Sequence, residues 1–226
     1  MTGGPTSGAS RLLRAGMGTA AVGLLLIYNS VGTGTDFGAE DGRPVPPAAT
    51  ASAVPGPAGA ADADAASRTP ALGRAKPTRL RIPQIAVDAP FTELTVNPAG
   101  QLDAPPPNDK NLVGWYRDGV TPGERGSAVL AGHVDTTTGP AVFLLLSFLQ
   151  PGNKVEVSRE DGTVAVFSVD SVETFAKNAF PDAKVYGRTP DAQLRLITCG
   201  GAYDKKQRDY LNNVVVFAHL ESSHPG

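Results

Sequence analysis

The chain has 226 residues, and its 20 lysines and arginines against 22 aspartates and glutamates give a formal net charge of −2. This balance excludes the basic footprint that neutralising several phosphates requires, so no nucleic-acid partner is expected. The single cysteine, Cys199, excludes an internal disulfide and any zinc site built from two or more thiolates. At this length, one domain with appendages is the expected organisation.

The N-terminal segment predicts export. Residues 1–14 carry Arg11 and Arg14 and are expected to be cytoplasmic, and residues 15–35 are all uncharged. As a helix, residues 15–35 would be about 31 Å long, enough to cross a bilayer core, and the flanking charges place the N-terminus inside. A cleaved signal peptide is the competing interpretation, because the apolar centre is short and small residues follow it. A buried core helix fits the charge asymmetry poorly. We therefore expect a single-pass cell-membrane protein with an extracytoplasmic domain.

Residues 36–76 predict a disordered linker. Within them, residues 41–76 hold 12 alanines, 6 prolines and 4 glycines, and no aromatic residue. Such a segment cannot bury enough apolar surface to offset the entropy lost on ordering. It would act as a tether between the membrane and the folded unit.

Residues 77–221 are expected to form the folded domain, followed by a short tail at 222–226. Apolar residues alternate with period two and predict strands at 80–82, 127–131, 154–158, 163–169, 193–198 and 213–220. Asp161-Gly162 predicts a hairpin turn, and only 140–149 is typical of a helix. Many strands with one or two short helices favour an all-β fold, either an antiparallel barrel or a closed sandwich.

The single thiol is the first candidate for chemistry. Cys199 follows the apolar strand 194–198 and precedes Gly200-Gly201, so a substrate could approach it closely. The alternative is a cysteine that is buried and inert. At its ordinary pKa a thiol is only about 3 % thiolate at pH 7, so nucleophilic chemistry requires a partner that takes the proton.

His133 is the best candidate for that partner among the three histidines. It ends the strand at 127–132 after a glycine, whereas His219 lies within a strand and His224 lies in the tail. A histidine at a strand end is also compatible with a purely structural role. Asp135, two residues further on, could orient the imidazole.

Two arginines are candidates to stabilise the oxyanion that forms during acyl transfer. Arg208 lies nine residues past Cys199, in the predicted loop 200–211, which antiparallel pairing would return toward the thiol. Arg195 shares a strand face with Cys199. Period two alone does not choose between them.

Taken together, Gly132-His133 ending one strand, Thr198-Cys199 ending another and Arg208 before the next strand resemble the sortases. Sortases are the cysteine transpeptidases that anchor surface proteins to Gram-positive cell walls. The resemblance covers about 78–220 and departs from the family's Thr-Leu-x-Thr-Cys pattern at Arg195, which replaces the first threonine. The phrases at 139–143 and 185–187 resemble the actinobacterial class F branch.

The resemblance implies an eight-stranded sortase-type barrel. It implies Cys199 as the acylated nucleophile, His133 as the acid and base, and Arg208 as the group that holds the substrate carbonyl and its oxyanion. Thr198, beside the nucleophile, is expected to contact the substrate.

The implied substrate is a surface protein with a Leu-Pro-x-Thr-Gly-like sorting signal, cut between Thr and Gly through a thioester that a cell-wall amine resolves. No acidic cluster clearly matches the calcium site of some members. No metal and no other cofactor is expected, and a monomer is expected.

Two other readings remain open. An L,D-transpeptidase also uses Cys and His on peptidoglycan, but usually in a Ser-x-Gly-Cys-type motif, whereas here the glycines follow Cys199. A non-catalytic barrel that binds wall peptides would keep Cys199 buried and inert.

Overall fold

A computed structural model of the protein describes residues 69–226. The predicted cytoplasmic residues, the predicted membrane segment and most of the predicted linker lie outside these residues. Within residues 69–226, no helix is both long enough and apolar enough to cross a membrane.

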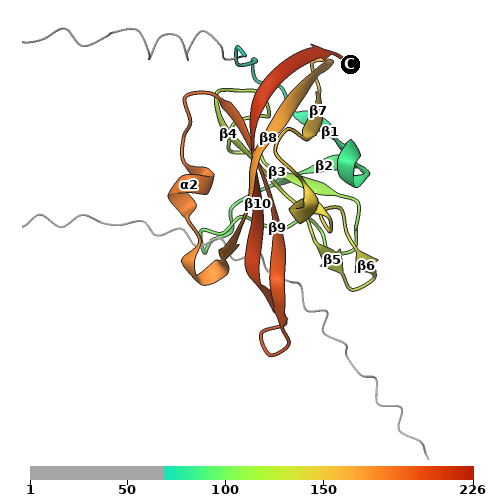
Figure 1. Cartoon of the computed structure of the whole chain (residues 1–226), viewed down its shortest axis with the longest axis vertical. Coiled ribbons are helices and arrows are strands. Elements are labelled where there is room, and N and C mark those ends of the chain that lie inside the picture. Colours follow the sequence, from blue (N-terminus) through green and yellow to red (C-terminus); the bar gives the residue numbers. More distant parts are fainter. Residues whose placement is uncertain (1–68) are drawn as a thin grey trace, which may run out of the picture.

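Eight strands close into a barrel in the order β1-β2-β3-β4-β9-β10-β8-β7 (Figure 1). Neighbouring strands pair antiparallel except β2 with β3 and β4 with β9, which are parallel. The expected all-β, eight-stranded fold is confirmed. The strands are β1 (Pro77–Ile82), β2 (Val87–Leu94), β3 (Val113–Tyr116), β4 (Gly126–Ala131), β7 (Lys154–Arg159), β8 (Thr163–Ala176), β9 (Ala192–Asp204) and β10 (Asp209–Pro225).

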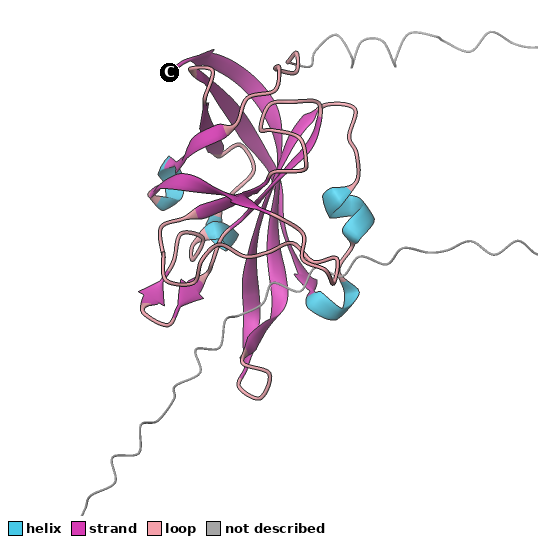
Figure 2. Cartoon of the chain, turned by 180° about the vertical axis from the view of Figure 1, so that it is seen from behind, coloured by secondary structure: helices cyan, strands magenta, loops and turns pink. Residues whose placement is uncertain are grey.

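The remaining elements are short. Strands β5 (Asp135–Thr136) and β6 (Gly139–Pro140) form a separate two-stranded sheet. Figure 2 shows how little of the domain is helical. The helical elements are the 3₁₀ turns η1 (Pro83–Ile85), η2 (Leu146–Phe148) and η3 (Lys177–Ala179) and the helix α2 (Asp182–Tyr186).

The helix predicted at 140–149 is wrong: the segment consists of turns that end in η2. Its hydrogen bonds span three residues, as from the Leu146 amide to the Phe143 carbonyl at 3.1 Å. Phe143, Leu146 and Leu149 enter the barrel core, while Leu144 is 41 % exposed. Buried residues spaced by three match the three-residue turn of a 3₁₀ helix, which explains the difference.

Side chains of the barrel wall face two separate apolar cores. On β9, Leu194 and Leu196 face the barrel interior, while Ile197 and Cys199 face outward. The outward residues pack beneath the connection from β8 to β9, which carries α2 outside the barrel wall (Figure 1). We call this second core the outer cluster: Leu94, Leu102, Val129, Ala131, Phe180, Val185, Ile197, Cys199, Val215 and Phe217.

Residues on both sides of the predicted domain, 77–221, contact the barrel. The amide of Leu72 donates to the Gly123 carbonyl at 2.8 Å, so residues 69–76 of the expected linker contact the barrel. At the other end, β10 continues to Pro225, which pairs with Thr163 of β8. The expected tail is therefore mostly part of the sheet.

Candidate active site

The parallel pair β4–β9 brings His133 and Cys199 to the same end of the barrel wall. The register pairs Ala131 with Ile197, and the Gly132 amide then donates to the Ile197 carbonyl at 3.1 Å. His133 and Cys199 follow this last bond on their two strands. The sequence predicted that Cys199 follows the end of a strand. Strand β9 instead continues to Asp204, so Cys199 lies within it.

Two hydrogen bonds hold His133 in place. Its Nε2 donates to the Pro105 carbonyl at 2.7 Å, and its own carbonyl accepts from the Phe143 amide at 3.0 Å. Because the first bond uses the hydrogen on Nε2, the neutral ring carries its lone pair on Nδ1. The orientation suits a residue that accepts and returns a proton at Nδ1.

Gly132 is required where it stands, because a Cβ there would lie 2.6 Å from the Phe143 ring and 2.8 Å from Val142. Phe143 is fully buried and cannot move away without disturbing the core. We expect Gly132→Ala to lower the unfolding free energy by about 1–3 kcal/mol, seen as a lower melting temperature, and to displace His133. Gly73→Ala is the control, since nothing lies within 4 Å of a Cβ there. Equal melting temperatures for the two variants would contradict the packing argument.

Cys199 is enclosed but not isolated. Its side chain is 9 % exposed within the outer cluster, and the Lys177 ammonium donates to its sulfur at 3.6 Å. Burial raises the pKa of the Cys199 thiol, and the charge of Lys177 opposes this, while Asp209 and Asp135 add to the increase. The net direction is upward, because desolvation penalises the thiolate most.

The raised pKa predicts how the thiol should react as pH changes. The thiolate is the species that alkylates, and a raised pKa lowers its fraction at neutral pH. We expect the rate of iodoacetamide modification of the free enzyme to climb with pH, with a midpoint above the value of about 8.5 of an ordinary cysteine. Cys199 is the only cysteine, so the assay reports on it alone, and a short cysteine peptide serves as reference. A midpoint below that of the peptide would contradict the prediction.

Sequence reasoning missed Lys177, whose ammonium contacts the sulfur of Cys199. Its ammonium lies 2.7 Å from both carboxylate oxygens of Asp209, and the two side chains are 9 % and 17 % exposed. The strand register explains the approach: Phe175 of β8 faces Asn213 of β10, which faces Cys199 of β9. Lys177 follows Phe175 by two residues, so its position could be found only from the pairing of all three strands.

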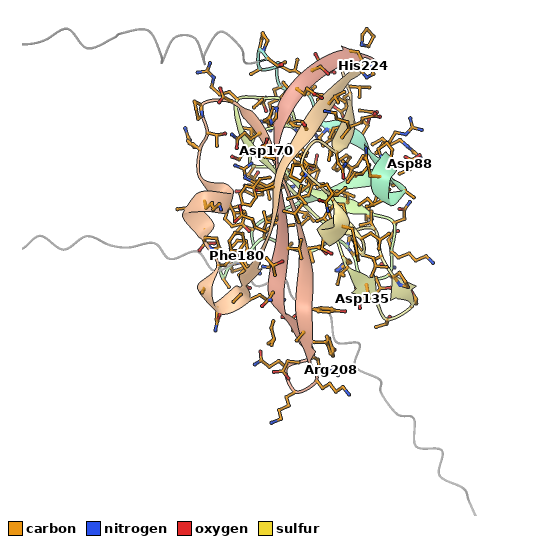
Figure 3. All side chains as sticks on the ribbon, in the orientation of Figure 1. Asp88, Asp135, Asp170, Phe180, Arg208 and His224 are labelled. Carbon is orange, nitrogen blue, oxygen red and sulfur yellow. The ribbon has the colours of Figure 1, made fainter. Side chains whose placement is uncertain are left out.

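Arg208 lies elsewhere. The pairing of β9 with β10 continues beyond Gly200 to Asp204 opposite Asp209, so the predicted loop 200–211 shrinks to a tight turn. Arg208 sits in this turn with a positive φ of 55°, and its exposed side chain lies at the free tip of the hairpin (Figure 3). Within residues 69–226, the structure brings Lys177 and not Arg208 to the sulfur. The role that the resemblance gives to Arg208 remains a prediction.

Arg195 and Asp135 are engaged with other partners. The Arg195 guanidinium is almost fully buried and lies over the Phe217 ring, 4.6 Å from its centroid. Asp135 accepts a hydrogen bond from the hydroxyl of Tyr210. Asp135 thus faces the thiol region from β5 but is bonded to Tyr210 and not to the imidazole.

Thr198 faces away from the thiol. It shares the inward face of β9 with Leu194 and Leu196, and its side chain is 1 % exposed. This orientation does not offer the hydroxyl to a substrate bound at the sulfur of Cys199. Of the other histidines, His219 pairs with Asp170 on the surface at 2.5 Å, and His224 lies near the end of β10 opposite Val164.

A cavity of about 1040 Å³ opens along the outer face of β4 beside α2. Val129 and Tyr116 line it from the barrel strands, Leu102 from the β2–β3 connection and Tyr186 from α2. Its charged lining residues are Arg74, Asp118, Arg125, Asp182 and Arg188. Cys199 is not a lining residue, but Val129 and Leu102 belong to the same outer cluster as the thiol. The cavity is therefore a groove of mixed lining, and its apolar side shares residues with the cluster that holds the thiol. In the described part of the chain, no group of three or more His, Cys, Asp or Glu residues is arranged to hold a metal ion.

Comparisons with known proteins identify the family and the fold. The protein-family model described as a sortase domain matches residues 80–221, well over half of the chain. The SrtA sortase from Actinomyces oris is 21 % identical, over 70 % of this chain and 90 % of that chain, with a TM-score of 0.52. Sortase C1 of Streptococcus agalactiae, solved in complex with MTSET, is 19 % identical, over 67 % and 70 %, with a TM-score of 0.50. These two likenesses show the fold alone.

A search of curated proteins finds no match. The matched residues 80–221 include Cys199 and His133 and reach from β1 into β10. Because the family model covers nearly the whole barrel, the chain belongs to the sortase family of cysteine transpeptidases.

Proposed function

We propose that this sortase cleaves a Leu-Pro-x-Thr-Gly-like sorting signal between Thr and Gly and transfers the acyl group to a cell-wall amine. Sortases act on surface proteins with sorting signals and on cell-wall amines. The observation that carries the proposal is the parallel pair β4–β9, which places Cys199 and His133 at one end of the barrel. The groove on the outer face of β4 supports it, because the apolar residues in its mixed lining suit the Leu-Pro part of the signal.

The proposed chemistry proceeds in two balanced steps. The thiol proton of Cys199 passes to His133, the sulfur attacks the Thr carbonyl carbon, and the C–N bond to Gly breaks as His133 protonates the leaving amine. The acceptor amine then attacks the thioester and gives its proton to His133. The new C–N bond forms as the C–S bond breaks, and the thiolate regains a proton from His133. Shielding of Cys199 within the outer cluster favours the amine over water.

The finer assignments belong to the same proposal. The phrases at 139–143 and 185–187 support placement in the actinobacterial class F branch. Anchoring through residues 15–35, with the N-terminus in the cytoplasm, would hold the enzyme, the signal and a lipid-linked amine at one surface and so raise their effective concentration. The protein is proposed to work as a monomer.

The proposal is tested with a panel of fluorogenic peptides and an acceptor amine resembling a wall precursor. We expect cleavage of the Leu-Pro-x-Thr-Gly-like peptides, ligation of the N-terminal product to the amine, and no reaction with a peptide of scrambled order. Turnover only of D-residue wall peptides would instead support the L,D-transpeptidase alternative. Binding of wall peptides without any turnover would support the non-catalytic barrel.

A further inference from the structure

The sulfur of Cys199 has a cation beside it that comes from the connection between β8 and β9. Lys177, the first residue of η3, reaches across the end of β10 and places its ammonium 3.6 Å from the sulfur. Asp209, the first residue of β10, holds the same ammonium through both carboxylate oxygens at 2.7 Å. The lysine side chain is 9 % exposed, so solvent screens its charge only weakly.

The charged and titratable groups that interact with the sulfur come from three elements. Lys177 acts on it from η3, Asp209 and Tyr210 from β10, and Asp135 from β5. His133 lies just after β4, the strand that pairs with β9. Asp135 accepts a hydrogen bond from the Tyr210 hydroxyl. Lys177 donates directly to the sulfur of Cys199.

We propose that Lys177, positioned by Asp209, supplies the positive charge that stabilises the thiolate of Cys199. Lys177 is then a catalytic residue, because it touches the reacting atom, and Asp209 is a positioning residue. The proposal rests on the proposed nucleophilic role of Cys199. It concerns the free enzyme, so it does not depend on which sorting signal is recognised or on the part that Arg208 plays with a bound substrate.

Lys177 and Asp209 act on the thiol in opposite directions. The charge of Lys177 favours the thiolate and lowers the pKa of Cys199, whereas the charge of Asp209 disfavours the thiolate and raises it. Removing the lysine charge should therefore move the pKa of the thiol up, and removing the aspartate charge should move it down. General loosening of the site would not produce two shifts of opposite sign.

The test is the pH dependence of iodoacetamide modification of the only cysteine, followed by mass spectrometry. For Lys177→Met we expect the midpoint to rise by roughly 1 pH unit, which is about a tenfold slower reaction at a fixed pH below it. For Asp209→Asn, whose amide oxygen can still accept from Lys177, we expect the midpoint to fall. Lys177→Arg keeps the charge and should restore a midpoint close to that of the unmodified protein.

Lys184→Met is the matched control. Lys184 lies on the same connection but pairs with Glu173 at the surface. In Lys184→Met the midpoint of Cys199 modification should therefore stay unchanged. Melting temperatures show which variants are folded, and Asp209→Asn keeps the proposal testable should Lys177→Met fail to fold. An unchanged or lower midpoint in folded Lys177→Met would overturn the proposal. A higher midpoint in Arg208→Ala with no rise in Lys177→Met would also overturn it, because the charge of Arg208 would then be the one acting on the thiol. Because no peptide substrate is used, an error in the proposed sorting signal would leave this result untouched.

Discussion

Cys199→Ala should abolish peptide cleavage while leaving the barrel folded. Without the sulfur there is no nucleophile to form a thioester, and a proton partner and a cation cannot replace it. The side chain is 9 % exposed in the outer cluster, so the missing atom leaves a small cavity that costs about 1 kcal/mol. For a domain of this size that corresponds to about 2–4 °C in melting temperature. Turnover of the sorting-signal peptide and thermal unfolding are the two measurements.

Cys199→Ser provides the comparison, because it keeps the shape of the side chain and replaces the thiol by a weaker nucleophile. It should also be inactive and should melt close to the unmodified protein. Cleavage that persists in folded Cys199→Ala would mean that another group carries the reaction, and the nucleophile would then be wrongly assigned.

His133→Ala should lower turnover by about 10²-fold or more, the scale expected when a positioned proton donor and acceptor is lost. The structure supports this role because the Nε2 bond to the Pro105 carbonyl leaves the lone pair of the neutral ring on Nδ1. Without the imidazole the leaving amine lacks a positioned proton donor, so turnover should fall across the whole pH profile. The measurement is the pH dependence of peptide cleavage.

His219→Ala is the matched control for this prediction. His219 pairs with Asp170 on the exposed surface and aligns through Gln193 with Ser127, near the start of β4, whereas His133 follows the end of that strand. Its removal should leave turnover within about twofold, the ordinary scale for a surface change of this kind. Equal losses for His133→Ala and His219→Ala would argue against a specific proton transfer by His133.

The all-β architecture could be predicted because apolar residues recur with period two in the segments that form strands. Successive side chains in 163–169 and 213–220 point to opposite faces of the sheet, and both faces are largely buried there, so these short apolar runs indicate strands. The Asp161-Gly162 turn was equally clear, since Gly162 takes a positive φ of 78° there. His133 and Cys199 were found because each closes or interrupts such a run beside a glycine.

The position of Lys177 beside Cys199 could not be predicted, because it depends on the register in which β8, β10 and β9 pair. Lys177 reaches Cys199 only because β10 lies between β8 and β9, with Phe175, Asn213 and Cys199 in line. Alternation within one strand says nothing about which residues of other strands stand opposite it. Arg208 was favoured by its closeness in the chain, but the paired hairpin carries it outward to the turn.

The prediction of a helix at 140–149 was wrong for a related reason. Its apolar composition was read correctly, and the segment does bury Phe143, Leu146 and Leu149. A run of mostly apolar residues does not fix whether the buried set repeats every 3.6 residues or every three, and the barrel core selects the tighter turn. The apolar composition of the segment predicted that it is buried, but its 3₁₀ geometry depends on how it packs against the barrel core.

Intact-protein mass spectrometry after incubation with a sorting-signal peptide, without acceptor amine and with an acid quench, tests the central claim most directly. The account predicts a mass increase equal to the peptide up to its Thr, mapped by digestion to Cys199, and its disappearance when the acceptor amine is added. Cleavage of the peptide with no adduct on Cys199, or with an adduct on another residue, would contradict it.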